Sequence, residues 1–245
     1  MIVNKSKQGL HIILHEAHGL LAGKIADEIK PEFRPINWFE TLIAVCEHDD
    51  RQLNFDEKDY LSDIGVPLDF TEEKMYAENV IERMLRIMKS SLNKSLWVRL
   101  LISYHLEFIY SDLLKTSKQM AEVLQEEKLF RKKILKEYKI SNFKAREYYE
   151  FLRFCDRLSL ILCKDETPTA GRLLEINTSI NQTQYFIKKD ENDVLRVSPW
   201  IFKTDEFKLS IEERLLSQTQ FNSSKQFEKV LLNTLPVLKK WTIAK

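Results

Sequence analysis

The sequence contains little glycine, proline or cysteine, and each of these shortages argues against one class of fold or binding site. Its 245 residues include only 5 glycines and 6 prolines, which favours long helices over a β fold with many tight turns. The glycines form no GxGxxG, P-loop or GxSxG pattern. The nucleotide-binding loops and related sites built on those patterns are therefore absent.

The 3 cysteines, Cys46, Cys155 and Cys163, lie in apolar surroundings. They are too few for a disulfide framework, and without a CxxC pair a thiolate zinc site is not expected. No apolar run approaches the ~20 residues that span a bilayer, and the N-terminal stretch has no small-residue cleavage site. We therefore expect a soluble, cytoplasmic protein that does not associate with membranes.

Neither sign of charge dominates, since 38 basic residues face 37 acidic ones and the net charge is +1. This balance gives no electrostatic reason to expect nucleic acid or an anionic membrane as a partner. Apolar residues make up 44% of the chain, which supports an ordinary packed core. The length suits one large domain or two small ones, and no Pro/Gly/Ser-rich linker divides it, so we expect a single domain over residues 1–245.

Apolar periodicity predicts a short N-terminal hairpin followed by a helical body over about residues 16–163. Thr71 is expected to cap the third helix of that body, and the polar stretch 50–70 is expected to be a long, functional loop. The helices are predicted at 16–29, 38–48, from 71 to about 88, 95–114, 117–139 and 143–163.

After Cys163 the apolar runs shorten and polar residues become more frequent, so the part from about 171 to 245 is expected to be β-rich. Strands are predicted at 184–189, 194–202, 207–216 and 240–244, with a helix at 223–235. We expect these strands to form one small sheet with the N-terminal hairpin. The predicted fold class is therefore mainly α, a helical bundle with a small β-sheet built from both chain ends.

Polar groups interrupt the apolar helices at four places. His15 and His18 are three residues apart and share one helix face, which also fits a surface or capping pair. His48, Asp49 and Asp50 end the second helix in the stretch CEHDD. Histidine suits the negative end of a helix dipole, whereas two aspartates there are unfavourable without a cation.

The other two places lie in the most apolar segments. His105, in LLISYHLEFIY, reads on its own as a core histidine whose hydrogen bonds are satisfied. Asp156, in FLRFCDRLSLILC, needs a partner because burying an unpaired carboxylate is costly. That partner is either Arg153 or Arg157 on the same helix or a metal ion, and one ion would explain all four places.

Imidazole and carboxylate ligands suit manganese, iron or zinc and need no thiolate. We therefore expect a divalent metal ion as cofactor, with manganese, iron, zinc and magnesium as the candidates. Such an ion lowers the pKa of bound water and makes hydroxide available near neutral pH.

The order of these groups, a His, then His-Asp, then a late Asp on another helix, resembles the HD-domain superfamily of metal-dependent phosphohydrolases. The resemblance implies that His18, His48, Asp49 and Asp156 hold the ion. It also implies that His105 occupies the place where some members carry an extra histidine for a second metal.

A closer resemblance is to an uncharacterised bacterial family related to that superfamily. The motifs that carry it cover nearly the whole chain in fixed order: EAHGLLAGKIA, HDDRQLNFD, GVPLDF, SYH, DRLSLILC and SPWIF. One departure is that Arg51 and Gln52 follow the aspartates where that family has Gly-Trp. The resemblance implies a single HD-like domain, while the departure bears on the substrate pocket more than on the ligands.

The resemblance implies hydrolysis of phosphomonoesters, phosphodiesters or nucleotides, with a small phosphorylated molecule or nucleotide as the binding partner. In such an enzyme Asp50 and Asp56 are expected to orient water or act as a base. Lys24 and Arg157 are expected to bind phosphate, because cations must offset its charge. Two alternatives are a non-catalytic ligand-binding or interaction module and a metal-using oxygenase on a similar helical scaffold.

Overall fold

The computed structural model describes residues 1–74, 76–113 and 117–245. Its helices are α1 (His15–Glu28), the short 3-10 helix η1 (Pro31–Phe33), α2 (Trp38–Glu47), α3 (Ala77–Leu92), α4 (Leu96–Ile109), α5 (Lys118–Glu137), α6 (Asn142–Cys163) and α7 (Ser224–Asn233). Its strands are β1 (Ile2–Ser6), β2 (Gly9–Ile13), β3 (Leu174–Ile180), β4 (Thr183–Lys189), β5 (Leu195–Ser198), β6 (Glu206–Leu216) and β7 (Val237–Ala244). Among the described residues, no helix has the length and apolar character needed to cross a membrane.

The strands join in one seven-stranded sheet with the order β1-β2-β6-β7-β5-β4-β3. Neighbouring strands are antiparallel except β5 and β7, which are parallel. The long strand β6 connects the two parts of the sheet, because its first residues pair with β7 and its last residues pair with β2. The sheet curls into a half-barrel.

The prediction of a mainly α bundle with a small sheet is wrong, because the chain is 46% helix and 20% strand and the sheet forms a half-barrel. The pairing of the N-terminal hairpin with a late strand is present, as Leu10 lies opposite Leu216. The sheet was underestimated because β3 has the sequence LEINTSI, whose Asn, Thr and Ser are typical of loops. Strand β7 also begins at Val237, ahead of the predicted start at 240.

The third helix begins at Ala77, not at Thr71. The Thr71 hydroxyl donates to Asp69 Oδ1 at 2.6 Å, and Asp69 in turn accepts the backbone N–H of Val3 at 3.0 Å. Thr71 therefore stabilises the loop after α2 and its contact with β1 instead of capping a helix.

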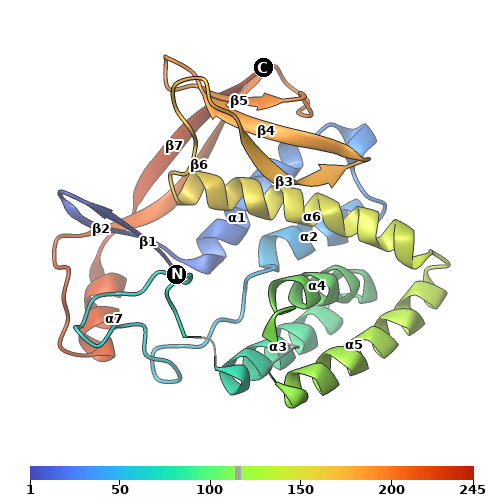
Figure 1. The fold of residues 1–245 in the computed structure, drawn as a ribbon, viewed down its shortest axis with the longest axis horizontal. Coiled ribbons are helices and arrows are strands. Elements are labelled where there is room, and N and C mark those ends of the chain that lie inside the picture. The colour runs from blue at the N-terminus through green and yellow to red at the C-terminus, as the bar shows by residue number, and fades with distance from the viewer. Residues whose placement is uncertain (75, 114–116) are drawn as a thin grey trace.

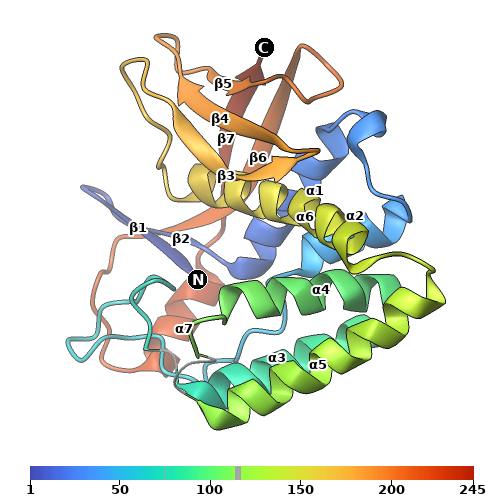
Figure 2. The same ribbon diagram turned by 45° about the vertical axis from the view of Figure 1, so that its right-hand side comes forward.

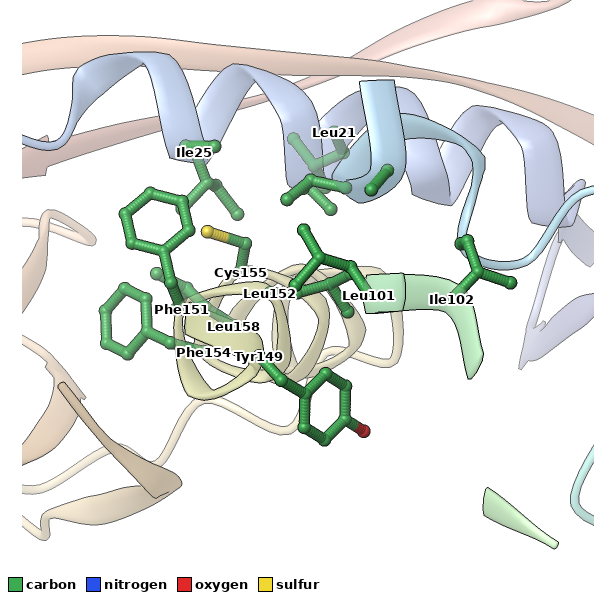
Figure 3. Packing of buried hydrophobic residues seen from close by; sticks show 14 of the residues in the cluster. Leu21, Ile25, Leu101, Ile102, Tyr149, Phe151, Leu152, Phe154, Cys155 and Leu158 are labelled. Carbon is green, nitrogen blue, oxygen red and sulfur yellow. The ribbon is translucent and has the colours of Figure 1, made fainter. Parts of the chain in front are cut away.

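Helix α6 lies between the β3–β4 side of the sheet and the layer of α3, α4 and α5 (Figure 1 and Figure 2). Leu21 and Ile25 of α1 point towards α6, where Leu152 and Cys155 meet them (Figure 3). Leu101 of α4 lies in the same cluster of fully buried residues. This continuous core holds α1, α4 and α6 rigidly against one another.

A second apolar cluster joins the N-terminal hairpin to the end of the chain, with Ile12 packed among Leu216, Phe227 and Leu231. We expect Ile12→Ala to lower the free energy of unfolding by about 2–5 kcal/mol, because it leaves a cavity in this cluster. Urea unfolding measures the change. The control Leu235→Ala, at a side chain that is 86% exposed, should change stability by less than about 0.5 kcal/mol. Equal stabilities of the two variants would contradict a structural link between the chain ends.

Candidate metal centre

Two glycines bring α1 and α2 into close contact. A Cβ on Gly19 would lie 2.1 Å from the carbonyl oxygen of Cys46, and a Cβ on Gly23 would lie 2.3 Å from the Cys46 Sγ. Only glycine allows this approach, because it has no side chain to separate the helices. His18 on α1 is thereby brought beside His48, which is the C-cap residue of α2.

Three side chains from three parts of the chain meet at this contact. His18 Nε2 lies 3.2 Å from His48 Nε2 and 3.1 Å from Asp156 Oδ1. His48 Nε2 lies 3.2 Å from the same Asp156 oxygen. Both histidines are fully buried, and Asp156 projects from α6.

The remaining ring nitrogens have fixed roles. His48 Nδ1 lies 2.7 Å from the Val45 carbonyl oxygen, which can only accept, so this nitrogen carries a hydrogen. Ser159 Oγ donates to the Asp156 carbonyl oxygen at 2.8 Å and therefore accepts from His18 Nδ1 at 2.8 Å. When both rings are neutral, the lone pairs of His18 Nε2 and His48 Nε2 therefore point at each other and at Asp156 Oδ1.

Three buried acceptor atoms at these distances require a positive charge between them, supplied by a shared proton or by a metal cation. Burial disfavours a charge on His48, but the Asp156 carboxylate outweighs burial and raises the His48 pKa to about 9. Burial would raise the pKa of Asp156, yet the charge on His48 and its hydrogen bond to the carboxylate hold this pKa well below its usual range. The cluster is thus built to keep a carboxylate ionised and to hold a positive charge, which a metal would take over from the proton.

The separations fit the ligands of a single ion. Zinc and similar ions bind nitrogen and oxygen at about 2.0–2.2 Å, which places neighbouring ligand atoms about 2.8–3.6 Å apart at bond angles of about 90–110°. The observed 3.1–3.2 Å separations lie within that range. Each ring also has its other nitrogen anchored to an acceptor, as metal-bound histidines do.

Asp49 lies beside this cluster, with its Oδ2 3.9 Å from His18 Nε2. His15 Nδ1 lies 3.1 Å from the same oxygen, and Arg83 donates to Oδ1 at 2.8 Å. Burial would raise the pKa of Asp49, but His15 and Arg83 outweigh it and hold this pKa well below its usual range. Burial and neighbouring cations lower the pKa of His15 to about 4, so a neutral His15 donates its N–H to an ionised Asp49.

His105 approaches from α4. Its ring centroid lies 4.9 Å from that of His48, and burial, together with the charge on His48, lowers its pKa to about 4. It is therefore neutral and able to bind a metal. Two groups have ligand atoms within 4.8 Å of one another, His18 with His48 and Asp49, and His48 with His105 and Asp156. The structure thus brings all five predicted ligands together.

A pocket of about 450 Å³ adjoins the cluster, and Asp49, His105 and Asp156 lie in its wall. This volume suits a small-molecule ligand. Polar side chains share the wall with apolar and aromatic ones, the latter including Phe70, Val80, Ile109, Tyr110 and Leu160.

The structure places the two aspartates predicted to activate water outside this pocket. Asp50 lines a separate, open pocket together with Arg51 and Arg86. Asp56 is exposed, and its backbone N–H donates to Asn54 Oδ1 in a local turn at 2.9 Å. Neither aspartate lines the pocket beside the cluster, so the structure does not bring them to the position that their predicted role requires.

The two cations predicted to bind phosphate also lie elsewhere. Lys24 donates to the Ser210 carbonyl oxygen on β6 at 2.7 Å, because six residues from His18 correspond to about 240° around a helix. Arg157 is about 100° from Asp156 around α6 and pairs with Glu166 at 3.4 Å. The described cations in the pocket wall are instead Lys58, Lys74 and Arg83.

Three residues that support the cluster or line its pocket were not predicted from the sequence. Ser159 lies one helical turn after Asp156 and orients His18, a role that the i, i+3 spacing within DRLSL could have suggested. Arg83 occupies a buried position on α3, so a basic residue within the apolar stripe of that helix was the available signal. No local pattern marked Glu73, which lies in the loop before α3.

The arrangement is a histidine–carboxylate cluster at the wall of a small pocket, with ligand atoms close enough to hold a metal ion. Residues 1–218 match the family described as a protein of unknown function, DUF3891, and the chain belongs to this family. This match confirms the expected uncharacterised family and does not by itself connect the chain to the HD-domain superfamily. No curated protein and no solved structure matches the chain.

We expect Gly19→Ala to separate α1 from α2, because its new methyl group would overlap the Cys46 carbonyl oxygen. Stability should fall by about 1–3 kcal/mol or more, and bound divalent metal should be lost as His18 moves away from His48. Thermal unfolding and elemental analysis measure the two effects. Leu20→Ala, at a side chain of α1 that is 59% exposed, is the control. A Gly19→Ala protein with unchanged stability and metal content would refute this role of the glycine.

Proposed function

We propose that this protein is a metal-dependent phosphohydrolase that acts on a small phosphorylated molecule. The observation that carries the proposal is the convergence of His18 Nε2, His48 Nε2 and Asp156 Oδ1 at 3.1–3.2 Å beside a pocket that contains Arg83. The order of these residues in the chain, with Asp49 directly after His48, also resembles the ligand motif of the HD-domain phosphohydrolases. That resemblance concerns the motif and not the fold class.

The charge of the pocket favours a phosphate monoester. Its described wall contains three carboxylates, those of Asp49, Glu73 and Asp156, and three permanent cations, Lys58, Lys74 and Arg83. These charges cancel, so a divalent ion would leave a net charge of +2. A phosphate monoester carries about −1.5 to −2 at neutral pH, whereas a diester carries a single negative charge and would neutralise the pocket less completely.

The ion would be held by His18, His48, Asp49 and Asp156, with His105 as a further ligand. When bound, such an ion lowers the pKa of a coordinated water and offsets the charge of a phosphate group. Asp49 is fixed for its role as a ligand, because His15 donates to its Oδ2 and Arg83 donates to its Oδ1. Arg83 is the phosphate-binding candidate, since its guanidinium lies in the pocket wall and carries a permanent charge.

A metal-using oxygenase is the second candidate, because two histidines and one carboxylate also form the ligand set of non-haem iron oxygenases. The three cations of the pocket wall favour the phosphohydrolase. An oxygenase would bind iron in preference to manganese and would consume oxygen during turnover.

Metal binding tests the centre directly. We expect wild-type protein purified without chelators to contain a divalent transition metal. Asp156→Asn should reduce manganese affinity by more than the 10–100-fold that is typical for loss of an outer-shell partner. Isothermal titration calorimetry with manganese measures the affinities. Asp193→Asn, at a carboxylate that is 87% exposed, is the matched control. A wild-type protein that binds neither manganese, iron nor zinc would refute the metal centre.

Hydrolysis tests the reaction. We expect the manganese-loaded protein to hydrolyse p-nitrophenyl phosphate faster than bis(p-nitrophenyl) phosphate, and Arg83→Met to lower kcat/KM for the monoester by about 10–150-fold, as expected for a charge-assisted hydrogen bond. Arg86→Met is the control, because Arg86 pairs with Glu57 and lines the other pocket. A metal-loaded protein that hydrolyses neither compound, or two variants with equal loss, would contradict the proposed function.

A further inference from the structure

Two polar atoms in the pocket wall are buried and have no hydrogen-bond partner among the described residues, Arg83 Nε and Glu73 Oε1. Both side chains line the pocket, and they are only 7% and 12% exposed. A buried polar atom without a partner is unfavourable, and native proteins contain few of them. Both atoms therefore mark positions where a bound molecule can supply the missing hydrogen bond.

The two atoms require opposite hydrogen-bonding groups on the bound molecule. Arg83 Nε is a donor and requires an acceptor, which a phosphate oxygen provides. Glu73 Oε1 is an acceptor and requires a donor. A phosphate ester satisfies both atoms only when its alcohol portion carries a hydrogen-bond donor.

The surroundings of Glu73 favour a neutral donor over a cationic one. Its other oxygen, Oε2, already pairs with Lys58 Nζ, so the carboxylate charge is balanced. The neighbouring Lys74 also lines the pocket, and an ammonium group would be repelled by both lysines. Neutral polar side chains suited to hydroxyl groups lie in the same wall, namely Gln52, Thr71 and Asn79.

We propose that the pocket selects phosphate monoesters whose alcohol portion carries a further hydroxyl group, and that Glu73 is the residue that recognises this hydroxyl. The inference rests on the proposed function for the identity of the acidic group as phosphate. Glu73 is a specificity-determining residue in this account and takes no part in the reaction at phosphorus.

Three probes with equal numbers of non-hydrogen atoms isolate the contact: 2-hydroxyethyl phosphate, propyl phosphate and 2-aminoethyl phosphate. They differ only in a terminal hydroxyl, methyl or ammonium group. With the full-length, manganese-loaded protein, we expect 2-hydroxyethyl phosphate to bind at least about tenfold more tightly than propyl phosphate, because a hydrogen bond to a carboxylate has about this effect. It should also bind more tightly than 2-aminoethyl phosphate. Calorimetry gives the affinities, and phosphate release gives kcat and KM.

Variants of Glu73 assign the preference to this residue. Glu73→Leu should remove the preference for the hydroxyl, so that the affinities for 2-hydroxyethyl phosphate and propyl phosphate become nearly equal, because the loss of the carboxylate charge affects both phosphates alike. Glu73→Gln keeps an acceptor and should retain most of the preference. Glu78→Leu is the matched control, because Glu78 is an exposed residue in the first turn of α3 and should leave all three probes unaffected.

Equal affinity for the hydroxyl and methyl probes in the wild type would overturn the inference, as would a Glu73→Leu variant that keeps the preference. A preference for the ammonium probe would also overturn it, since it would show that Glu73 recognises a cation. Binding that discriminates among the probes without any phosphate release would support the pocket assignment while refuting the hydrolytic function. Discrimination in binding and turnover of the probes therefore test the two proposals separately.

Discussion

The candidate site depends on one buried interaction, the meeting of the Asp156 carboxylate with two imidazole nitrogens that face it as acceptors. The hydrogens on the opposite sides of both rings are committed to Val45 and Ser159, so the rings cannot turn to relieve the contact without losing those bonds. An ionised carboxylate and two lone pairs at this distance are tolerated only around a positive charge. The pairing of Asp156 with histidines, in place of the arginines of its own helix, follows from this geometry.

The fold supplies the constraint through contacts that are distant in sequence. The approach of α1 to α2 across Gly19 sets His18 beside His48, and the packing of α6 against α1 adds Asp156 from more than a hundred residues away. The sheet contributes indirectly, because β6 pairs with the N-terminal hairpin and α1 follows directly from that hairpin. A substitution in the sheet or at the α1–α2 contact would therefore displace residues of the cluster that the substituted side chain does not contact.

The residues of the cluster could be singled out from the sequence because each one breaks an apolar pattern. A carboxylate in the middle of FLRFCDRLSLILC and a histidine with two aspartates at a helix end are unfavourable unless something compensates for them. Most helix boundaries followed from periodicity to within two residues. The exceptions are both ends of α3 and the end of α4, which is at Ile109 and not at 114. The sheet was less predictable, because β3 has a loop-like composition and the joining of β6 to both β2 and β7 is a long-range property.

The residues around the ligands could not be assigned from spacing alone. Lys24 and Arg157 are close to the cluster residues in the sequence but turn away from them around their helices, whereas Arg83 reaches the pocket from α3 and Glu73 from the loop after α2. Proximity in sequence predicts contact only at helical or strand periodicity, and the part of the pocket wall that comes from the loop before α3 has no such period. Recognition of substrate is therefore the part of the account that depends most on the three-dimensional structure.

Anomalous diffraction from crystals soaked in manganese tests directly whether the cluster binds a metal ion. We expect a single strong peak, or two adjacent peaks if His105 takes part, within bonding distance of His18 Nε2, His48 Nε2 and the Asp156 carboxylate. Crystals that show no peak among these atoms, with the two histidines still hydrogen-bonded to Asp156, would contradict it. The cluster would then be a proton-sharing network in the core of the protein.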